Sequence, residues 1–262
     1  MTKQPAAYYR PDNLPEALRL LQQPDTLPLA GGTKLLAADV TAAVVDVQDL
    51  GLNQVKAGEA ALEVGAALTL AALTAVLQPE NEATPAPLLL KAVHQAGPNT
   101  YRNAATLGGT IASRLPDSEL LAALLVLDAS LTLYTPDPVE MSLVDYLAGA
   151  ERPFGLITAV TIPWQTGRFA SERVARTPAD TPIVSVTLWQ PDGEFPRLAA
   201  TGISPLPRRL TAAEQAMADG AVETAVTAAK AACTHPGDFR GDSAYRADMA
   251  AVLTRRVLTA VQ

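Results

Sequence analysis

Two short stretches of the sequence combine paired glycines with hydroxyl residues, a combination suited to binding an anion through the backbone. The first glycine segment, residues 29–36, reads LAGGTKLL, and the second glycine segment, residues 105–112, reads ATLGGTIA. Glycine lets the backbone approach a ligand closely, so successive N–H groups can point at a phosphate with no side chain between them. Because two such segments could hold one long ligand, the pair predicts a site for a dinucleotide.

A single Gly-Gly pair is more often an ordinary turn, since glycine is the usual residue wherever φ must be positive. The repetition of the pattern weakens that alternative. Neither segment spells G-x-G-x-x-G or G-x-x-x-x-G-K-[ST], so the site would differ from the Rossmann and P-loop types. Thr33, Thr106 and Thr110 could add hydroxyl donors. Lys34 could help to neutralise a diphosphate, although exposure to solvent is the commoner position for a lysine.

Few other residues of the chain could carry chemistry. Cys233 is the only cysteine, and the two histidines, His94 and His235, lie far apart in the sequence. This set excludes an internal disulfide, a cysteine-ligated iron–sulfur cluster and a typical zinc site. We therefore assign no catalytic residue and no metal ligand, and any metal redox centre must lie on another chain. Residues 101–103 could contact a ligand or brace the second glycine segment.

The composition limits the partners of the protein. A formal net charge of −7 argues against a nucleic-acid or anionic-membrane partner, because both require a basic surface. The chain has no run of about 18 uncharged apolar residues and no signal-peptide pattern at its start, so we expect a cytoplasmic protein without membrane insertion. Hydrophobic residues make up 48% of the 262 residues, which is enough for a sizeable core.

The elements around the two glycine segments are expected to mix short strands with helices. Asp12 or Asn13 is placed to cap a helix that begins with Pro15 and Glu16. A buried strand then leads directly into the first glycine segment. Further strands are expected at residues 43–47, 61–65, 131–134 and 156–162, and helices at residues 69–76, 88–96, 118–127 and 141–147.

The last third of the chain has a different pattern. The polar residues 165–180 show little periodicity and are expected to connect two domains. Two antiparallel strands, 183–188 and 197–202, should flank a turn. Three helices are expected beyond them, at residues 211–217, 223–233 and 243–261. The last helix should bury a face made of Tyr245, Met249, Val252, Leu253 and Val257.

Several motifs in chain order resemble the FAD-binding medium subunit of the molybdenum hydroxylases, the xanthine dehydrogenase and carbon monoxide dehydrogenase family. They are AYYRPDNLPEALRLL, AGGTKLL, VGAALTLAAL, YRNAATLGGTIA, RLAATGISPLPRRLTAAE and DFRGDSAYRADMAAVLTRRVL. The resemblance implies an α+β fold of the vanillyl-alcohol-oxidase (PCMH) type, with two α+β subdomains that bind FAD. A small C-terminal domain of a three-stranded antiparallel sheet and helices should follow. We expect subdomain 1 in residues 1–54, subdomain 2 in residues 55–165 and the C-terminal domain in residues 166–262.

The resemblance also implies which residues hold FAD. Both glycine segments should bind the pyrophosphate, and an acidic residue on the following helix should contact the ribose end, where the family usually has Asp. The expected cofactor-binding residues are Leu29, Ala30, Gly31, Gly32, Thr33, Lys34, Leu35, Thr106, Gly108, Gly109, Thr110 and Glu119. The sequence departs from the family pattern at Lys34, at Thr110, where relatives usually have Asn, and at Thr181, where they often have an aromatic residue.

The implied function is electron transfer within a multi-subunit molybdenum hydroxylase. The FAD of this chain would pass electrons from the iron–sulfur clusters of one partner subunit to an external acceptor, while a third subunit holds the molybdopterin. The departures at Lys34, Thr110 and Thr181 motivate an alternative, a structural subunit of such a complex without flavin. A second alternative is a stand-alone flavin oxidoreductase, which would turn over substrate without partners.

Overall fold

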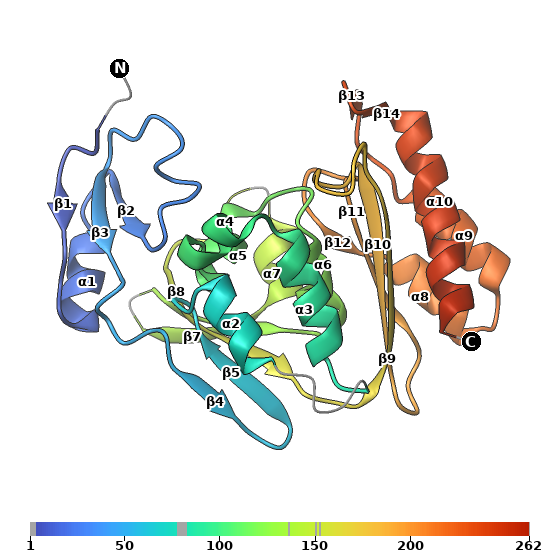
Figure 1. The fold of residues 1–262 in the computed structure, drawn as a ribbon, viewed down its shortest axis with the longest axis horizontal. Helices are drawn as coiled ribbons and strands as arrows, with labels where there is room; N and C mark the ends of the chain where they lie inside the picture. Colours follow the sequence, from blue (N-terminus) through green and yellow to red (C-terminus); the bar gives the residue numbers. More distant parts are fainter. Residues whose placement is uncertain (1–3, 78–82, 136, 150, 152, 262) are drawn as a thin grey trace.

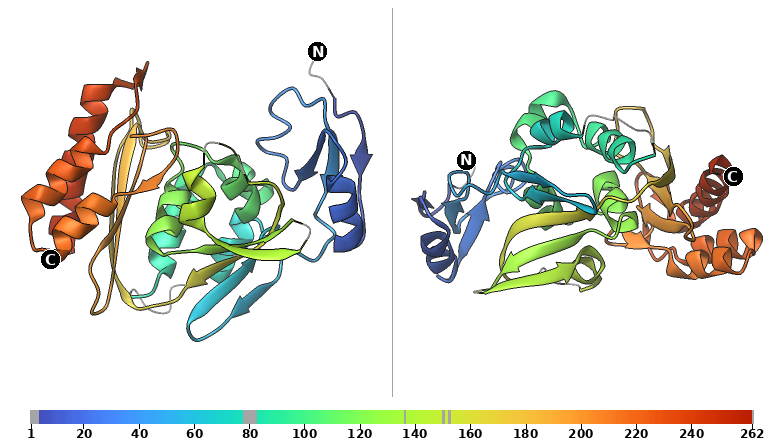
Figure 2. Two further views of the ribbon diagram at one scale, coloured as in Figure 1. Left: turned by 180° about the vertical axis from the view of Figure 1, so that it is seen from behind. Right: turned by 90° about the horizontal axis from the view of Figure 1, so that it is seen from below.

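The structure is a computed structural model that describes residues 4–77, 83–135, 137–149, 151 and 153–261. Three units follow one another along the long axis of the molecule, and the chain passes through them in order (Figure 1). The middle unit contacts both of the others. The views from behind and from below show the same linear arrangement (Figure 2).

The N-terminal unit is a small parallel sheet with one helix. Its strands are β1 (Tyr8–Tyr9), β2 (Thr26–Leu29) and β3 (Ala43–Asp46), in the order β1-β3-β2, and its helix is α1 (Leu14–Leu21). The side chain of Asn13 caps α1 by accepting a hydrogen bond of 2.9 Å from the backbone N–H of Glu16. Because the first glycine segment begins in the last residue of β2, it lies at the carboxyl edge of this sheet, where α/β proteins usually bind ligands.

The middle unit places helices against a five-stranded antiparallel sheet of order β4-β5-β8-β6-β7. The strands are β4 (Val55–Ala57), β5 (Ala61–Gly65), β6 (Ser130–Tyr134), β7 (Pro138–Ser142) and β8 (Leu156–Pro163). The helices are α2 (Leu70–Val76), α3 (Ala86–Gln95), α4 (Asn99–Ala104), α5 (Leu107–Ser113), α6 (Glu119–Val126) and α7 (Leu143–Ala148). Every residue of α6 is buried, as its apolar sequence predicts, because the helix is enclosed between this unit and the next.

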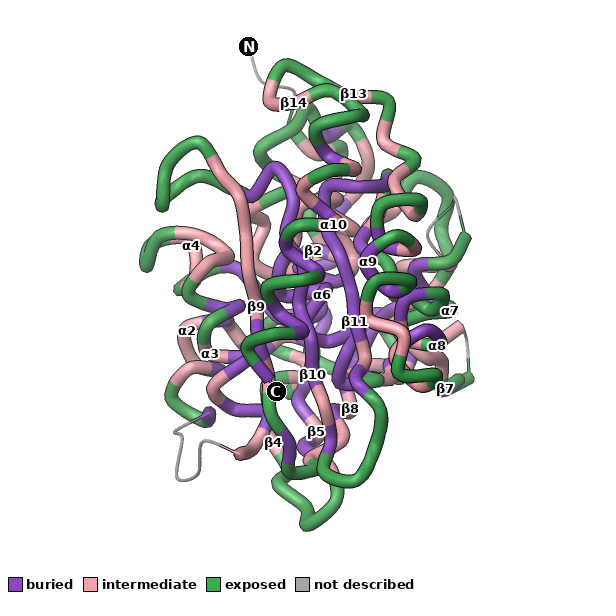
Figure 3. Tube along the Cα trace, turned by 90° about the vertical axis from the view of Figure 1, so that its right-hand side faces the viewer, coloured by how far each residue is buried: buried purple, intermediate pink, exposed green. Residues whose placement is uncertain are grey.

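The C-terminal unit is an antiparallel sheet of order β12-β11-β10-β9, covered by helices on its outer face. Its strands are β9 (Gly167–Val174), β10 (Val184–Pro191), β11 (Arg197–Thr201) and the two-residue β12 (Arg208–Arg209). The helices are α8 (Thr211–Ala218), α9 (Val222–Ala231) and α10 (Ser243–Ala260), and a hairpin of β13 (Gly237–Asp238) and β14 (Gly241–Asp242) precedes α10. Figure 3 shows α9 and α10 lying over the largely buried strands β10 and β11.

Two expectations about the C-terminal unit are corrected by the structure. The polar stretch 165–180 is not simply a connection, because residues 167–174 form β9 and pair with β10 along its whole length. The expected three-stranded sheet is therefore present as β9, β10 and β11, and β12 extends it. Hydrophobic periodicity missed β9 because its residues are mostly half-buried and polar.

The buried face of α10 also differs from the expected one. Leu253 and Val257 are buried as predicted, but Tyr245 and Val252 are 37% and 40% exposed. Relative to the expected orientation, the helix is turned about its axis so that Arg246 is fully buried against the sheet. This rotation is possible because the Arg246 guanidinium finds backbone carbonyl acceptors there, which an apolar pattern cannot reveal.

Candidate functional site

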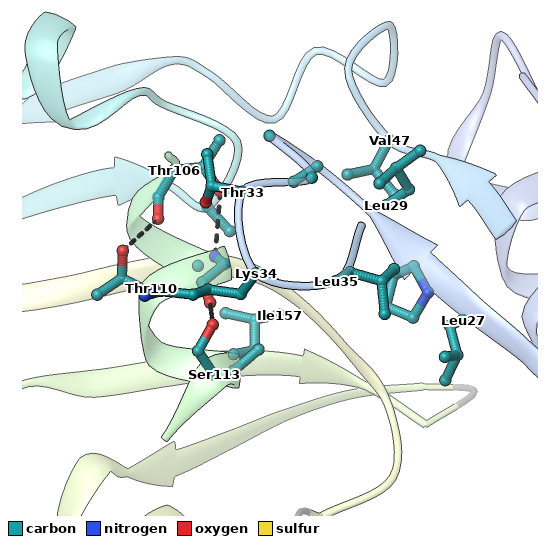
Figure 4. Close-up of a pocket in the computed structure, with 18 of the residues that line it drawn as sticks. Leu27, Leu29, Thr33, Lys34, Leu35, Val47, Thr106, Thr110, Ser113 and Ile157 are labelled. Atoms are coloured by element: carbon teal, nitrogen blue, oxygen red, sulfur yellow. Dashed lines mark hydrogen bonds between the residues drawn. The ribbon is translucent and has the colours of Figure 1, made fainter. Parts of the chain in front are cut away.

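A cavity of about 520 Å³ lies between the N-terminal unit and the middle unit, and both glycine segments line it (Figure 4). This volume falls within the range of about 300–1,000 Å³ typical of ligand sites. The expected site residues that line it are Leu29, Ala30, Gly31, Gly32, Thr33, Lys34, Leu35, Thr106, Gly108, Gly109 and Thr110. The fold thus brings together two segments that lie about seventy residues apart in the sequence.

The first glycine segment combines a place in the cavity lining with backbone N–H groups that have no acceptor in the described structure. Gly32 has a φ of 67°, and the chain then turns so that the N–H of Leu36 donates to the carbonyl of Gly32 at 2.9 Å. Within the part of the chain that the structure describes, the N–H groups of residues 31–35 donate no hydrogen bond. Because these residues also line the cavity, the segment has the properties of an anion-binding nest.

The second glycine segment is built differently from the expected loop, because its glycines form the first turn of α5. The hydroxyl of Thr106 caps this helix and accepts from the N–H of Gly109 at 3.1 Å. The N–H of Gly108 donates to the carbonyl of Ala66 at 2.8 Å, and the N–H of Thr110 donates to the carbonyl of Thr106 at 2.9 Å. These amides are already satisfied, so the expectation of a second nest of free amides is wrong. The predicted hydroxyl donor of Thr110 is likewise engaged, since its Oγ1 donates to the carbonyl of Thr106 at 2.9 Å.

The two glycines of the second segment have separate roles in the geometry. A β-carbon on Gly108 would lie 2.6 Å from the β-carbon of Ala66, so this glycine allows α5 to pack closely on the chain after β5. A β-carbon on Gly109 would meet only the hydroxyl of Thr106 within 4 Å outside its own helix. Gly109 also lines the cavity, and its missing side chain therefore leaves room there.

Charged side chains are scarce in the cavity. Lys34 is the only cation and Asp39 the only carboxylate among the described residues that line it. The ammonium of Lys34 lies 5.3 Å from the centre of the Tyr101 ring, on α4 of the middle unit. The neighbouring Arg102 donates to the carbonyls of His94 and Gly97 at 3.2 and 3.0 Å, so it braces the backbone before the second segment.

Glu119 is placed away from the cavity lining. It is the first residue of α6, its side chain is 3% exposed, and its Oε2 lies 3.2 Å from a guanidinium nitrogen of Arg173 on β9. Burial raises the pKa of Glu119 to about 7, and the positive charges of Arg173 and Lys91 only partly oppose this rise. Its Oε1 is buried without a hydrogen-bond partner in the described structure. The structure therefore points this carboxylate towards the C-terminal unit.

Sequence reasoning missed several cavity walls that come from distant parts of the chain. The middle unit adds apolar and aromatic surface through Ala66, Tyr146, Leu156 and Ile157. Their positions follow from the order of the strands, in which β5 and β8 are neighbours although about ninety residues separate them. The only local signal is the small Ala66-Ala67 pair after β5, which permits the close approach of α5.

The described part of the chain shows neither a metal site nor a membrane-spanning helix. No group of three His, Cys, Asp or Glu side chains there is arranged to hold a metal ion. None of the described helices combines the length and the apolarity that a membrane crossing requires.

Comparison with known proteins explains this arrangement. Residues 3–165 match a family model described as the FAD binding domain in molybdopterin dehydrogenase. The chain belongs to the FAD-binding medium subunits of the molybdenum hydroxylases. Residues 184–261 of this medium subunit match a second model, the CO dehydrogenase flavoprotein C-terminal domain. FAD is thus its cofactor, and it is a subunit of an oxidoreductase.

Individual relatives agree with this assignment. The medium subunit is 32% identical over 256 residues to the uncharacterized protein YgfM of Escherichia coli K12, an alignment that covers 94% of this chain and 92% of YgfM. It is 28% identical to the carbon monoxide dehydrogenase medium chain of Afipia carboxidovorans, with 96% of this chain and 94% of that one covered. Among solved structures, reconstituted CO dehydrogenase from Oligotropha carboxidovorans has a chain 26% identical to this one, with a TM-score of 0.87 and coverage of 100% of this chain and 99% of that one. The expected α+β flavin fold is confirmed.

Proposed function

We propose that this medium subunit holds FAD through the first glycine segment and relays electrons from an iron–sulfur partner subunit to an external acceptor. The observation that carries the proposal is that the N–H groups of residues 31–35 donate no hydrogen bond within the described structure, while these same residues line a cavity large enough for a ligand. Residues 31–35 are half-buried or exposed, so these amides are open to solvent and remain available to an anion that enters the cavity. The diphosphate of FAD is an anion of suitable length.

The shape of the second glycine segment also supports the binding of FAD in this cavity. Its amides are bonded within the protein and do not bind a ligand. The segment instead forms one wall of the cavity, and Gly109 leaves that wall without a side chain at its position. Bound FAD would supply the redox chemistry, while the protein binds and orients the cofactor. No side chain lining the cavity is proposed as an acid or a base.

The relay function follows from what this chain lacks. The sequence has one cysteine, too few to ligate an iron–sulfur cluster by cysteine, and we propose that the electrons come from a cluster on another chain. We propose as partners an iron–sulfur subunit and a molybdopterin subunit, because the relatives are medium chains of dehydrogenases. We place the assembly in the cytoplasm.

The relay is tested by mixing the FAD-loaded chain with its iron–sulfur partner, reduced beforehand by dithionite, under anaerobic conditions. The absorbance bands of oxidised flavin should bleach in stopped-flow traces with the cognate partner and persist with an unrelated reduced ferredoxin. Flavin that stays oxidised beside the reduced cognate partner would refute the relay. Substrate turnover by this chain alone would also refute it and would favour a stand-alone oxidoreductase.

A further inference from the structure

Lys34 is exposed at the cavity, as is common for lysine, and its charge has no ionic partner among the described residues. Within the described residues, its ammonium makes no ion pair and no hydrogen bond, and its one recorded contact is the face of the Tyr101 ring. Lys34 belongs to the first glycine segment, whereas Tyr101 belongs to α4 of the middle unit. The contact therefore spans the cavity from one unit to the other.

The contact with Tyr101 is weak compared with an ion pair to a phosphate. A cation–π contact at a partly exposed site is less stable than a charge-assisted hydrogen bond to an anion, which is among the strong polar contacts in proteins. Lysine carries its charge on a flexible four-carbon stem, so the ammonium can move several ångströms without a change in the backbone. Lys34 can thus exchange the ring for an anion in the same cavity.

The position of Lys34 directs this exchange to the diphosphate. The residue lies among the N–H groups of residues 31–35 that donate no hydrogen bond. No other cation among the described lining residues can neutralise a ligand anion, and the whole chain has a net charge of −7, which opposes anion binding. A single local positive charge therefore has a large influence on the affinity for an anion.

We infer that Lys34 is an exchangeable clasp, which rests on Tyr101 across the cavity and transfers to the diphosphate when FAD binds. The inference rests on the proposed location of FAD in this cavity. Lys34 would then favour ligands that carry a diphosphate over ligands that carry none. The flavin ring and the ribityl chain should be insensitive to this charge.

The test measures binding of FAD, ADP and riboflavin to the purified chain by flavin fluorescence or calorimetry at several salt concentrations. Lys34→Met should weaken FAD and ADP binding by about tenfold at low salt, because a charge-assisted contact is lost. The variant should also show a flatter salt dependence, since screening acts on the removed charge. Riboflavin, which has no phosphate, should bind equally to both proteins.

Two control variants distinguish the contact of Lys34 with the diphosphate from a general effect of removing a positive charge. Lys34→Arg keeps the charge and should restore most of the FAD affinity. Lys56→Met removes the same charge on β4, where the lysine pairs with Glu63 at 2.7 Å outside the cavity, and it should change neither the affinity nor the salt dependence. Equal FAD affinity and salt dependence in Lys34→Met and wild type would overturn the clasp while leaving the FAD site intact. A wild-type chain that binds no FAD would overturn the site itself, and the clasp with it.

Discussion

Gly31 lies directly against the carbonyl oxygen of Ala104, so close that a β-carbon at residue 31 would come within 1.7 Å of that oxygen. The two residues belong to different units, the first glycine segment and the end of α4. Both colliding groups are backbone or attached to backbone, so neither can rotate away. This contact fixes the distance between the two walls of the cavity.

Replacing Gly31 with Ala should therefore separate the N-terminal unit from the middle unit. We expect the free energy of unfolding to fall by about 1–3 kcal/mol, the usual effect of overpacking. FAD affinity should fall by about tenfold or more, because the amides of the first segment move away from the opposite wall. Calorimetry and FAD titration measure the two effects. Gly149→Ala is the control, since its β-carbon would meet its nearest atom at an ordinary 3.4 Å. FAD affinity equal to that of the control would contradict the prediction.

Substitution of the two glycines of the second segment should affect different properties, stability at Gly108 and FAD binding at Gly109. Gly108→Ala forces a β-carbon against Ala66, and we expect a loss of stability of about 1–3 kcal/mol. Gly109→Val instead fills cavity space and disturbs the Thr106 cap, which contributes about 1 kcal/mol. Thermal unfolding and FAD titration should show mainly a stability defect in the first variant and mainly a binding defect in the second. A Gly109→Val protein that retains FAD at wild-type affinity would exclude Gly109 from the site.

Glu119 should make stability depend on pH in an unusual direction. Burial raises its pKa from 4.5 to about 7, so the folded protein keeps a proton that the unfolded chain loses. Stability therefore falls as the pH rises from about 4.5 to about 7. The charged groups acting on the carboxylate are Arg173 and Lys91, which favour its ionised form, and Asp117, which disfavours it.

Glu119→Gln should remove this contribution, on the order of 3 kcal/mol at pH 8, because the pKa rises from 4.5 to about 7 and each pKa unit corresponds to about 1.4 kcal/mol. The variant should match wild type at pH 4.5 and exceed it in stability at pH 8. Urea unfolding across this range measures the difference. Glu140→Gln, at an exposed position on β7, is the control and should track wild type throughout. Parallel curves for wild type and Glu119→Gln would show that folding does not raise the pKa of Glu119.

The buried Arg246 should be the most sensitive arginine of the C-terminal unit. Its guanidinium donates to the carbonyls of Ile183 and Gly202 at 2.6 and 2.7 Å and pairs with Asp238 at 2.6 Å. Arg246→Met leaves these acceptors without a donor, and we expect a loss of about 3–5 kcal/mol. Arg255→Met, which breaks an exposed pair with Glu223, should have little effect. Similar denaturation midpoints for the two variants would contradict this assignment.

Local signals in the sequence predicted many of the helices and strands and singled out the first glycine segment. The helices that begin after Asn13, Thr69 and Ser118 were predicted because an N-cap acts on the N–H group three residues ahead and needs no distant partner. The first glycine segment was identified for the same reason, since backbone freedom at Gly32 is a property of that residue alone. The order of the motifs along the chain then indicated the family.

Only the tertiary structure decided which groups are still free to bind. The amide of Gly108 donates to the distant carbonyl of Ala66, Glu119 pairs with Arg173, and Arg246 is buried against carbonyls at the ends of two strands. Each of these partners is distant in sequence or is set by the packing of α5, α6 and α10. A residue type states what a side chain or amide could donate or accept, but burial and the nearest competing partner determine whether that capacity remains for a ligand.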